Sequence, residues 1–196
     1  MRTIVCALLC LGCLMVGCTR TPDTTWYILQ SNAVQPSLTQ LKGARVQLRK
    51  VDIPAYLDRN AIVTREGGVR LRLAEYDAWA EPLGSGMQRA LADCLAPLLQ
   101  EQNVLLQALD DDSTGPLQLF VQVQRFDGTL GAEATLDARW SLRNTDDRAL
   151  ARGSFHASEG AGDTYESLVR AQSHLVERLG RDIADPVAEA AKKSAH

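Results

Sequence analysis

The sequence predicts an α+β protein in which two helices pack on one face of a mostly antiparallel sheet, forming a two-layer sandwich. Three observations support this fold class. Segments after residue 116 alternate between apolar and polar residues, which is the period of a half-buried strand. Two other segments repeat apolar residues every three or four positions, as amphipathic helices do. The chain order of these segments is strands, helix, strands, helix.

Length, composition and charge narrow the class of protein. The chain has 196 residues, of which 45% are hydrophobic and 23% are charged, and its formal net charge is -3. The length fits one domain, and the composition fits a globular protein rather than a disordered one. The slightly acidic charge argues against nucleic acid as a partner, because phosphate contacts need a surplus of Lys and Arg.

Residues 1–17 have the pattern of a lipoprotein signal peptide. A positively charged start precedes an apolar stretch, Thr3 to Val16, which is too short to span a bilayer because spanning takes roughly 20 residues. The sequence Met15-Val16-Gly17-Cys18 resembles a bacterial lipobox, with Met in place of the more common Leu. An ordinary signal peptide with a chance cysteine is the alternative.

The lipobox predicts that Cys18 is the acylated first residue of the mature protein. Thr19 follows it instead of the Asp that typically signals inner-membrane retention, so we expect anchoring on the periplasmic face of the outer membrane. Seven residues of tether after Cys18 reach at most roughly 25 Å. We therefore expect a lipidated tether at 18–25, a single domain at 26–190 close to the membrane, and a tail at 191–196.

The first half of the mature domain predicts short strands and one helix. Strands are expected at 26–29, 44–51, 61–65, 69–73 and 104–106. Gly67-Gly68 indicates a two-residue hairpin loop, because both positions of such a turn need positive φ. That register places Arg65 opposite Arg70, with Arg72 on the same face. Apolar spacing predicts a helix from Leu83 to Leu98.

The second half predicts a three-stranded meander and a closing helix. The strands are expected at 117–124, 133–143 and 149–157, after a loop at 110–116. Asp163 and Glu166 resemble a capping box for the last helix, which we expect Pro186 to end or kink.

No pattern for catalysis or metal binding stands out. The three histidines have no ligand partner at metal-binding spacing, and Ser85 is not in a nucleophile motif. Cys94 falls on the apolar stripe of its helix, which indicates a buried thiol rather than a nucleophile. The sequence therefore predicts no enzyme, no metal and no cofactor beyond the covalent acyl lipid on Cys18, with a hydrolase of unrecognised site as a rival.

Charge is unevenly distributed along the mature chain. Residues 42–72 hold eight basic and three acidic residues, whereas the rest of the mature chain holds twelve and twenty-one. Like charges directly opposite each other destabilise a strand pair, so the expected pairing of Arg65 with Arg70 suggests a surface that meets an acidic protein or anionic headgroups. Balance by carboxylates within the fold, or a different turn register, is the alternative.

Aromatic residues lie among charged ones at 53–59 and 74–83. Tyr and Trp suit partner anchoring because they join a large apolar area to a polar tip. The alternative for Tyr76 and Trp79 is that they close the end of the sandwich beside the first helix. The residues predicted to bind a partner are Tyr56, Arg59, Arg65, Arg70, Arg72, Tyr76 and Trp79.

The stretch IPAYLDRNAIVTR, followed by AEYDAWAEPL at the helix start, resembles the PqiC family of ABC-type transport auxiliary lipoproteins. These proteins are linked to paraquat-inducible and MCE-type lipid transport systems. The later FDG, with Leu136 and Trp140 in the following strand, is similar to the family as well.

This resemblance implies a non-enzymatic role in envelope integrity. The lipoprotein would dock a periplasm-spanning, PqiB-like MCE-domain protein, which works with an inner-membrane partner, at the outer membrane. The periplasm-spanning protein would form a conduit for lipid, and the end of a conduit is usually ring-shaped. This suggests that the lipoprotein forms a closed homo-oligomeric ring. A scaffold or assembly factor for an outer-membrane barrel or another envelope complex is the alternative, and the sequence leaves open whether the domain itself holds lipid.

Overall fold

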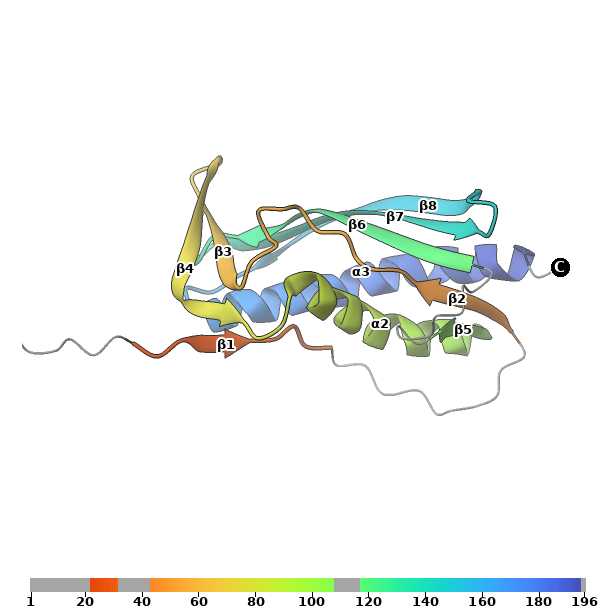
Figure 1. Ribbon diagram of the computed structural model, residues 1–196, viewed down its shortest axis with the longest axis horizontal. Helices are drawn as coiled ribbons and strands as arrows, with labels where there is room; N and C mark the ends of the chain where they lie inside the picture. Colours follow the sequence, from red (N-terminus) through yellow and green to blue (C-terminus); the bar gives the residue numbers. More distant parts are fainter. Residues whose placement is uncertain (1–21, 32–42, 108–116, 195–196) are drawn as a thin grey trace, which may run out of the picture.

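The computed structural model describes residues 22–31, 43–107 and 117–194, which form one mixed sheet and two long helices (Figure 1). Helices α2 (Leu83–Glu101) and α3 (Tyr165–Ser194) lie against the same face of the sheet. This confirms the α+β class and the placement of the helices. The signal peptide, the first residues of the tether and the loop at 110–116 fall outside the described residues.

Eight strands build the described sheet. Their bounds are β1 Thr25–Tyr27, β2 Ala44–Leu48, β3 Ala61–Glu66, β4 Arg70–Trp79, β5 Val104–Gln107, β6 Leu117–Gly128, β7 Glu133–Asn144 and β8 Ala149–Gly160.

The prediction of a mostly antiparallel sheet is wrong. Four of the seven strand pairings are parallel, namely β1–β4, β2–β5, β2–β6 and β3–β6. The antiparallel pairings are β3–β4, β6–β7 and β7–β8. Alternating hydrophobicity identifies a strand but not its partner, and the early short strands pair with strands far along the chain.

Strand β6 organises the sheet. One edge pairs with β7 along its length, while the other edge is shared by β2, by an isolated bridge at Asp52, and by the end of β3. The Asp52 N–H donates to the carbonyl of Val121 at 3.0 Å, and the Val123 N–H donates back to the Asp52 carbonyl at 2.8 Å. These pairings lay residues 46–52 and Thr64 alongside β6.

The core lies between the sheet and the helices. Alternate residues of β6 and β7, such as Leu119 and Leu136, meet apolar residues of the helices, such as Leu95 and Leu179, and all four are buried. Gly180 sets the approach of the two helices, since an added Cβ would lie 2.7 Å from the Sγ of Cys94. Cys94 is buried, as the sequence predicted, and burial raises the pKa of its thiol.

Helix α3 differs from the sequence prediction at both ends. It continues through Pro186 to Ser194, and Ala191 is fully buried, so residues 191–194 extend the helix rather than forming a tail. At the other end, the Ser167 N–H donates to the Thr164 hydroxyl at 3.2 Å, and the Thr164 N–H donates to the Ser167 hydroxyl at 3.3 Å. The reciprocal cap is therefore one residue later than the expected Asp163 pair.

Candidate functional site

The hairpin of β3 and β4 has a different register from the predicted one. Glu66 pairs with Arg70, which leaves a three-residue loop at 67–69 with φ of 57° at Gly67 and 80° at Gly68. Arg65 consequently lies opposite Leu71, so the predicted Arg65–Arg70 contact does not exist and the face shared by three arginines is broken up. Opposite charges take the place of the predicted arginine pair, because the Glu66 carboxylate forms an ion pair with the Arg72 Nε at 2.5 Å.

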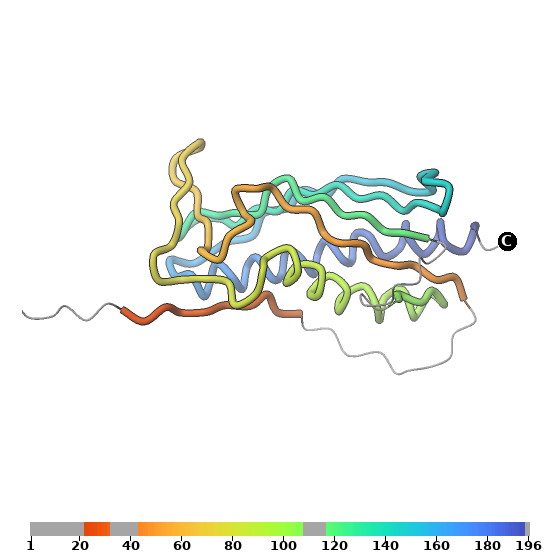
Figure 2. The backbone as a smooth tube through the Cα atoms, viewed as in Figure 1, coloured from red at the N-terminus to blue at the C-terminus, as the bar shows by residue number. Residues whose placement is uncertain are grey.

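This hairpin projects from one end of the sheet, on the side away from the helices (Figure 2). Its tip residue Val69 is 91% exposed, and Leu71 and Leu73 are 41% and 49% exposed. Arg70 and Arg72 are also exposed and lie on the other face of the hairpin, since side chains alternate along a strand. The hairpin thus presents one apolar face and one charged face, on which Glu66 pairs with Arg72 and Arg70 leaves a net positive charge.

A buried carboxylate holds the base of the hairpin. Asp127, at the end of β6, has a fully buried side chain. Its Oδ1 accepts hydrogen bonds from the Nε atoms of Arg65 and Arg125 at 2.9 and 3.0 Å, and its Oδ2 accepts from the Arg65 Nη2 at 2.6 Å and the Tyr56 hydroxyl at 2.9 Å. We call Asp127, Arg65, Arg125 and Tyr56 the Asp127 cluster.

The electrostatics of the Asp127 cluster favour the ionised carboxylate. Burial alone would raise the pKa of Asp127, but the hydrogen bonds from Arg65, Arg125 and Tyr56 outweigh it and hold that pKa below its usual value. Burial, together with the charge of Asp127, raises the pKa of Tyr56 to about 12, so Tyr56 stays a neutral donor. The hydrogen bond to Asp127 also raises the pKa of Arg65.

Arg65 links the Asp127 cluster to the hairpin loop. Its Nη1 donates to the Gly68 carbonyl at 2.6 Å, and its own carbonyl accepts from the Thr129 hydroxyl at 3.0 Å. Arg65 and Tyr56 therefore have internal partners and brace the hairpin, while Arg70 and Arg72 remain exposed at its free end.

The other predicted partner-binding residues are dispersed. Arg59 is exposed on the segment before β3. Tyr76 is half-buried on β4, where its hydroxyl donates to Glu75 at 2.7 Å. Trp79 is 5% exposed and belongs to the core at the base of β4, opposite Tyr27 of β1. The structure thus brings Tyr56 and Arg65 together at Asp127, and among the described residues neither makes a hydrogen bond or ion pair with Arg59, Tyr76 or Trp79.

Sequence reasoning missed Asp127 as the residue that organises this region. The available signal was the FDG motif, which stood out as a feature of the sequence without a role. A carboxylate at the end of an alternating strand looks solvent-exposed until the arginines that surround it are placed.

The described residues contain no group of three or more His, Cys, Asp or Glu side chains that could hold a metal ion. Among the same residues, no helix is long and apolar enough to cross a membrane. The fold and the site define a small α+β domain that presents a braced, projecting hairpin.

The family model for the ABC-type transport auxiliary lipoprotein component matches residues 27–184. The chain therefore belongs to this family, which confirms the resemblance to PqiC-like proteins. Its class is that of lipoproteins that serve a transport system. Membership of this family also fits a periplasmic protein that is anchored to a membrane.

Solved structures support the fold. An uncharacterized protein superimposes with a TM-score of 0.71 at 20% identity, covering 85% of this chain and 99% of its own. A protein from Xanthomonas campestris gives a TM-score of 0.70 at 13% identity, covering 87% of this chain and 99% of its own. No curated protein matches the sequence significantly. At these identities the likeness shows the fold alone.

Proposed function

We propose that this chain is a non-enzymatic lipoprotein, anchored through an acylated Cys18 to the periplasmic face of the outer membrane. There it docks the periplasm-spanning MCE-domain protein of an intermembrane lipid transport system. The observation that carries the proposal is the braced β3–β4 hairpin, whose exposed tip combines Val69 and Leu71 with Arg70 and Arg72. Membership of a transport auxiliary lipoprotein family supports the same role.

The arrangement of β1 and the hairpin suits this docking role. Strand β1, which follows the predicted tether, pairs with the base of β4 through Thr25 and Asp77. Seven residues of extended chain separate Asp77 from Arg70 at the loop, which is about 23 Å at roughly 3.3 Å per residue. In Figure 1 the hairpin tip points away from β1. A membrane near β1 would leave the tip facing the periplasm.

The chemistry of the tip suits a protein partner. An apolar face beside a face of net positive charge gives buried area together with charge selectivity. The partner surface should then carry apolar residues next to carboxylates. A closed ring of copies of this chain around the end of the conduit is part of the proposal, since several hairpins would then surround one axis.

Photo-crosslinking in native membranes tests the docking. A photoreactive residue at Val69 of the acylated full-length chain should capture an MCE-domain protein. The control is the same residue at the exposed Thr145, in the β7–β8 turn at the far end of the molecule (Figure 1). Capture should fall when Arg70 and Arg72 are both replaced by Gln. Capture of only a barrel or cell-wall component would contradict the transport role.

Two further measurements test the anchor and the ring. Cys18→Ser should move the protein from the membrane to the soluble periplasmic fraction. Sedimentation in detergent should give a multiple of the protomer mass, whereas a monomer at every concentration would contradict the ring while leaving the docking surface in place.

A further inference from the structure

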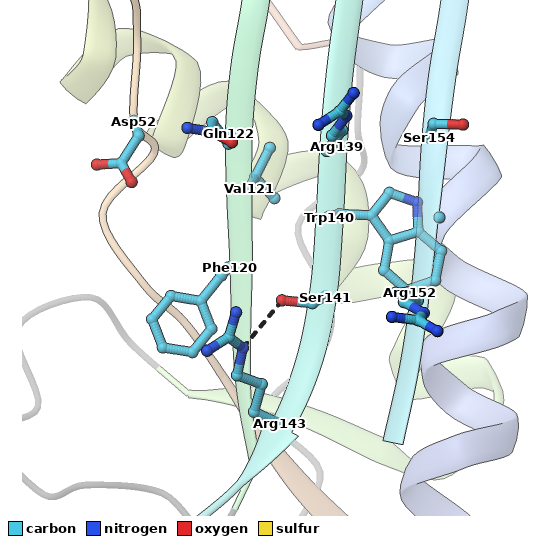
Figure 3. Close-up of a pocket in the computed structure, with 11 residues that line it drawn as sticks. Asp52, Phe120, Val121, Gln122, Arg139, Trp140, Ser141, Arg143, Arg152 and Ser154 are labelled. Atoms are coloured by element: carbon cyan, nitrogen blue, oxygen red, sulfur yellow. Dashed lines mark hydrogen bonds between the residues drawn. The ribbon is translucent and has the colours of Figure 1, made fainter. Parts of the chain in front are cut away.

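A groove of about 580 Å³ lies on the face of the sheet that the helices do not cover (Figure 3). Its walls come from β6, β7 and β8. The residues that matter here are Arg139, Ser141, Arg143, Arg152, Ser154 and Phe120. They alternate with the core residues of the same strands, so the sheet holds them outward on a rigid surface.

The strand register brings two arginines of this groove close together. Arg139 lies opposite Ser154, and Arg152 lies opposite Ser141. Arg139 and Arg152 are therefore diagonal neighbours on adjacent strands, with their Cα atoms roughly 7–8 Å apart. Neither guanidinium has an ion pair or hydrogen bond to any other residue within 22–31, 43–107 and 117–194. Two exposed arginines thus line one groove without an ion pair to any described residue, and the Asp52 carboxylate lies on its opposite margin.

The third arginine is fixed in place beside them. The Arg143 guanidinium lies over the Phe120 ring, 5.1 Å from its centroid, and its Nε donates to the Ser141 hydroxyl at 3.2 Å. Its Nη1 pairs with Asp147 at 2.8 Å. Arg143 therefore contributes a wall of the groove, while the unneutralised charge of the groove belongs to Arg139 and Arg152.

We propose that this groove binds a phosphate group, with Arg139 and Arg152 as its ligands and the hydroxyls of Ser141 and Ser154 as additional donors. A guanidinium presents a planar fork of N–H donors that matches two phosphate oxygens. A phosphate placed between two such forks supplies the counterion that the fold does not. Hydroxyls between the arginines donate to the remaining oxygens.

The opposite margin limits the size of the anion. Asp52 lines the groove on the far side of β6, two strand spacings or roughly 10 Å from β7. Its carboxylate would repel an extended polyanion, so the positive region accommodates one phosphate group. That group could belong to a phospholipid headgroup or to a small soluble phosphate, and the two sources share the same chemistry at the arginines.

Calorimetric titration of the acylated full-length protein in a non-ionic detergent tests the site. The probes are inorganic phosphate, glycerol 3-phosphate and dihexanoyl phosphatidylglycerol. Binding of all three with similar affinity would identify a soluble phosphate as the ligand source. Binding of the lipid at least tenfold more tightly would identify a headgroup. Absence of binding by every probe would overturn the proposal.

Variants connect the binding to the two arginines. Replacing Arg139 and Arg152 by Gln should weaken the tightest probe at least tenfold, and replacing both by Lys should give an intermediate loss because the charge remains while the fork is lost. The matched control replaces Arg170 and Arg181, two exposed arginines of α3, by Gln. Equal affinity of the Arg139/Arg152 Gln variant and the wild type would refute the assignment, with unfolding curves confirming that both remain folded.

Discussion

Replacing Asp127 by Asn removes the charge of the Asp127 cluster while keeping a side chain of the same size. The carboxylate accepts four hydrogen bonds, and the three that come from Arg65 and Arg125 are charge-assisted. Hydrogen bonds to charged groups contribute about 1.5–3 kcal/mol each. The Arg65 and Arg125 side chains are 23% and 37% exposed, so both regain water when the charge is removed. We therefore expect a loss of about 3 kcal/mol rather than the full sum.

Urea unfolding followed by circular dichroism measures this loss directly. For a domain of this size, about 3 kcal/mol corresponds to a fall in Tm of roughly 6–12 °C. The control is Asp147→Asn, which removes a carboxylate that is 76% exposed and pairs with Arg143, and should change the free energy of unfolding by about 0.5 kcal/mol or less. A loss below about 1 kcal/mol in Asp127→Asn would refute the reasoning that the buried carboxylate organises this end of the fold.

The pH dependence of the same variant provides a second readout. Because the pKa of Asp127 is lowered in the folded state, its stabilisation is fully present above the unfolded pKa of about 3.9. It is lost as the pH falls from there through the lower folded-state pKa. The wild type should therefore lose its advantage over Asp127→Asn in acid, and the two unfolding free energies should converge at pH values below the folded-state pKa of Asp127.

Three further substitutions test contacts elsewhere in the fold. Tyr56→Phe removes one donor from the buried carboxylate and should lower the free energy of unfolding by about 1.5–2 kcal/mol in urea titrations. Gly153→Ala places a Cβ 2.8 Å from the Trp140 ring and should cost about 1–3 kcal/mol, with a shift in tryptophan fluorescence, whereas Gly160→Ala on the same strand meets open space and should change little. Gly180→Ala should lower the free energy of unfolding although Ala has a better helix propensity than Gly, because the added Cβ would meet the Cys94 Sγ. If the same substitution is harmless in a Cys94→Ala background, the Sγ contact is the cause of the loss.

Local pattern predicted the elements of this fold better than their partners. The alternation along β7 and the apolar stripe of α2 specify which side of each element is buried, so those elements could be placed from sequence. The parallel pairings of β1, β2 and β3 depend on where distant segments fit along β4 and β6. No periodicity within a short strand encodes that choice.

At the candidate site, too, local pattern predicted the element but not its pairing. A Gly-Gly pair identified the hairpin but not whether its loop has two or three residues. The observed three-residue loop places Glu66 opposite Arg70 and in an ion pair with Arg72. One residue of register then separated Arg65 from the exposed arginines and directed it to Asp127. The net positive charge of residues 42–72 was visible in the sequence, whereas its division between an internal brace and an exposed tip required the neighbouring strand β6.

The brace explains how a two-stranded hairpin can act as a docking element. An isolated hairpin is marginally stable in water, and a flexible one would lose conformational freedom when it binds. Arg65 joins the loop carbonyl of Gly68 to the buried carboxylate of Asp127, so the order of the tip depends on a residue that is itself buried. Asp127→Asn should therefore reduce crosslinking from Val69 at temperatures where the domain is still folded. Unchanged crosslinking would show that the hairpin holds its shape without the brace.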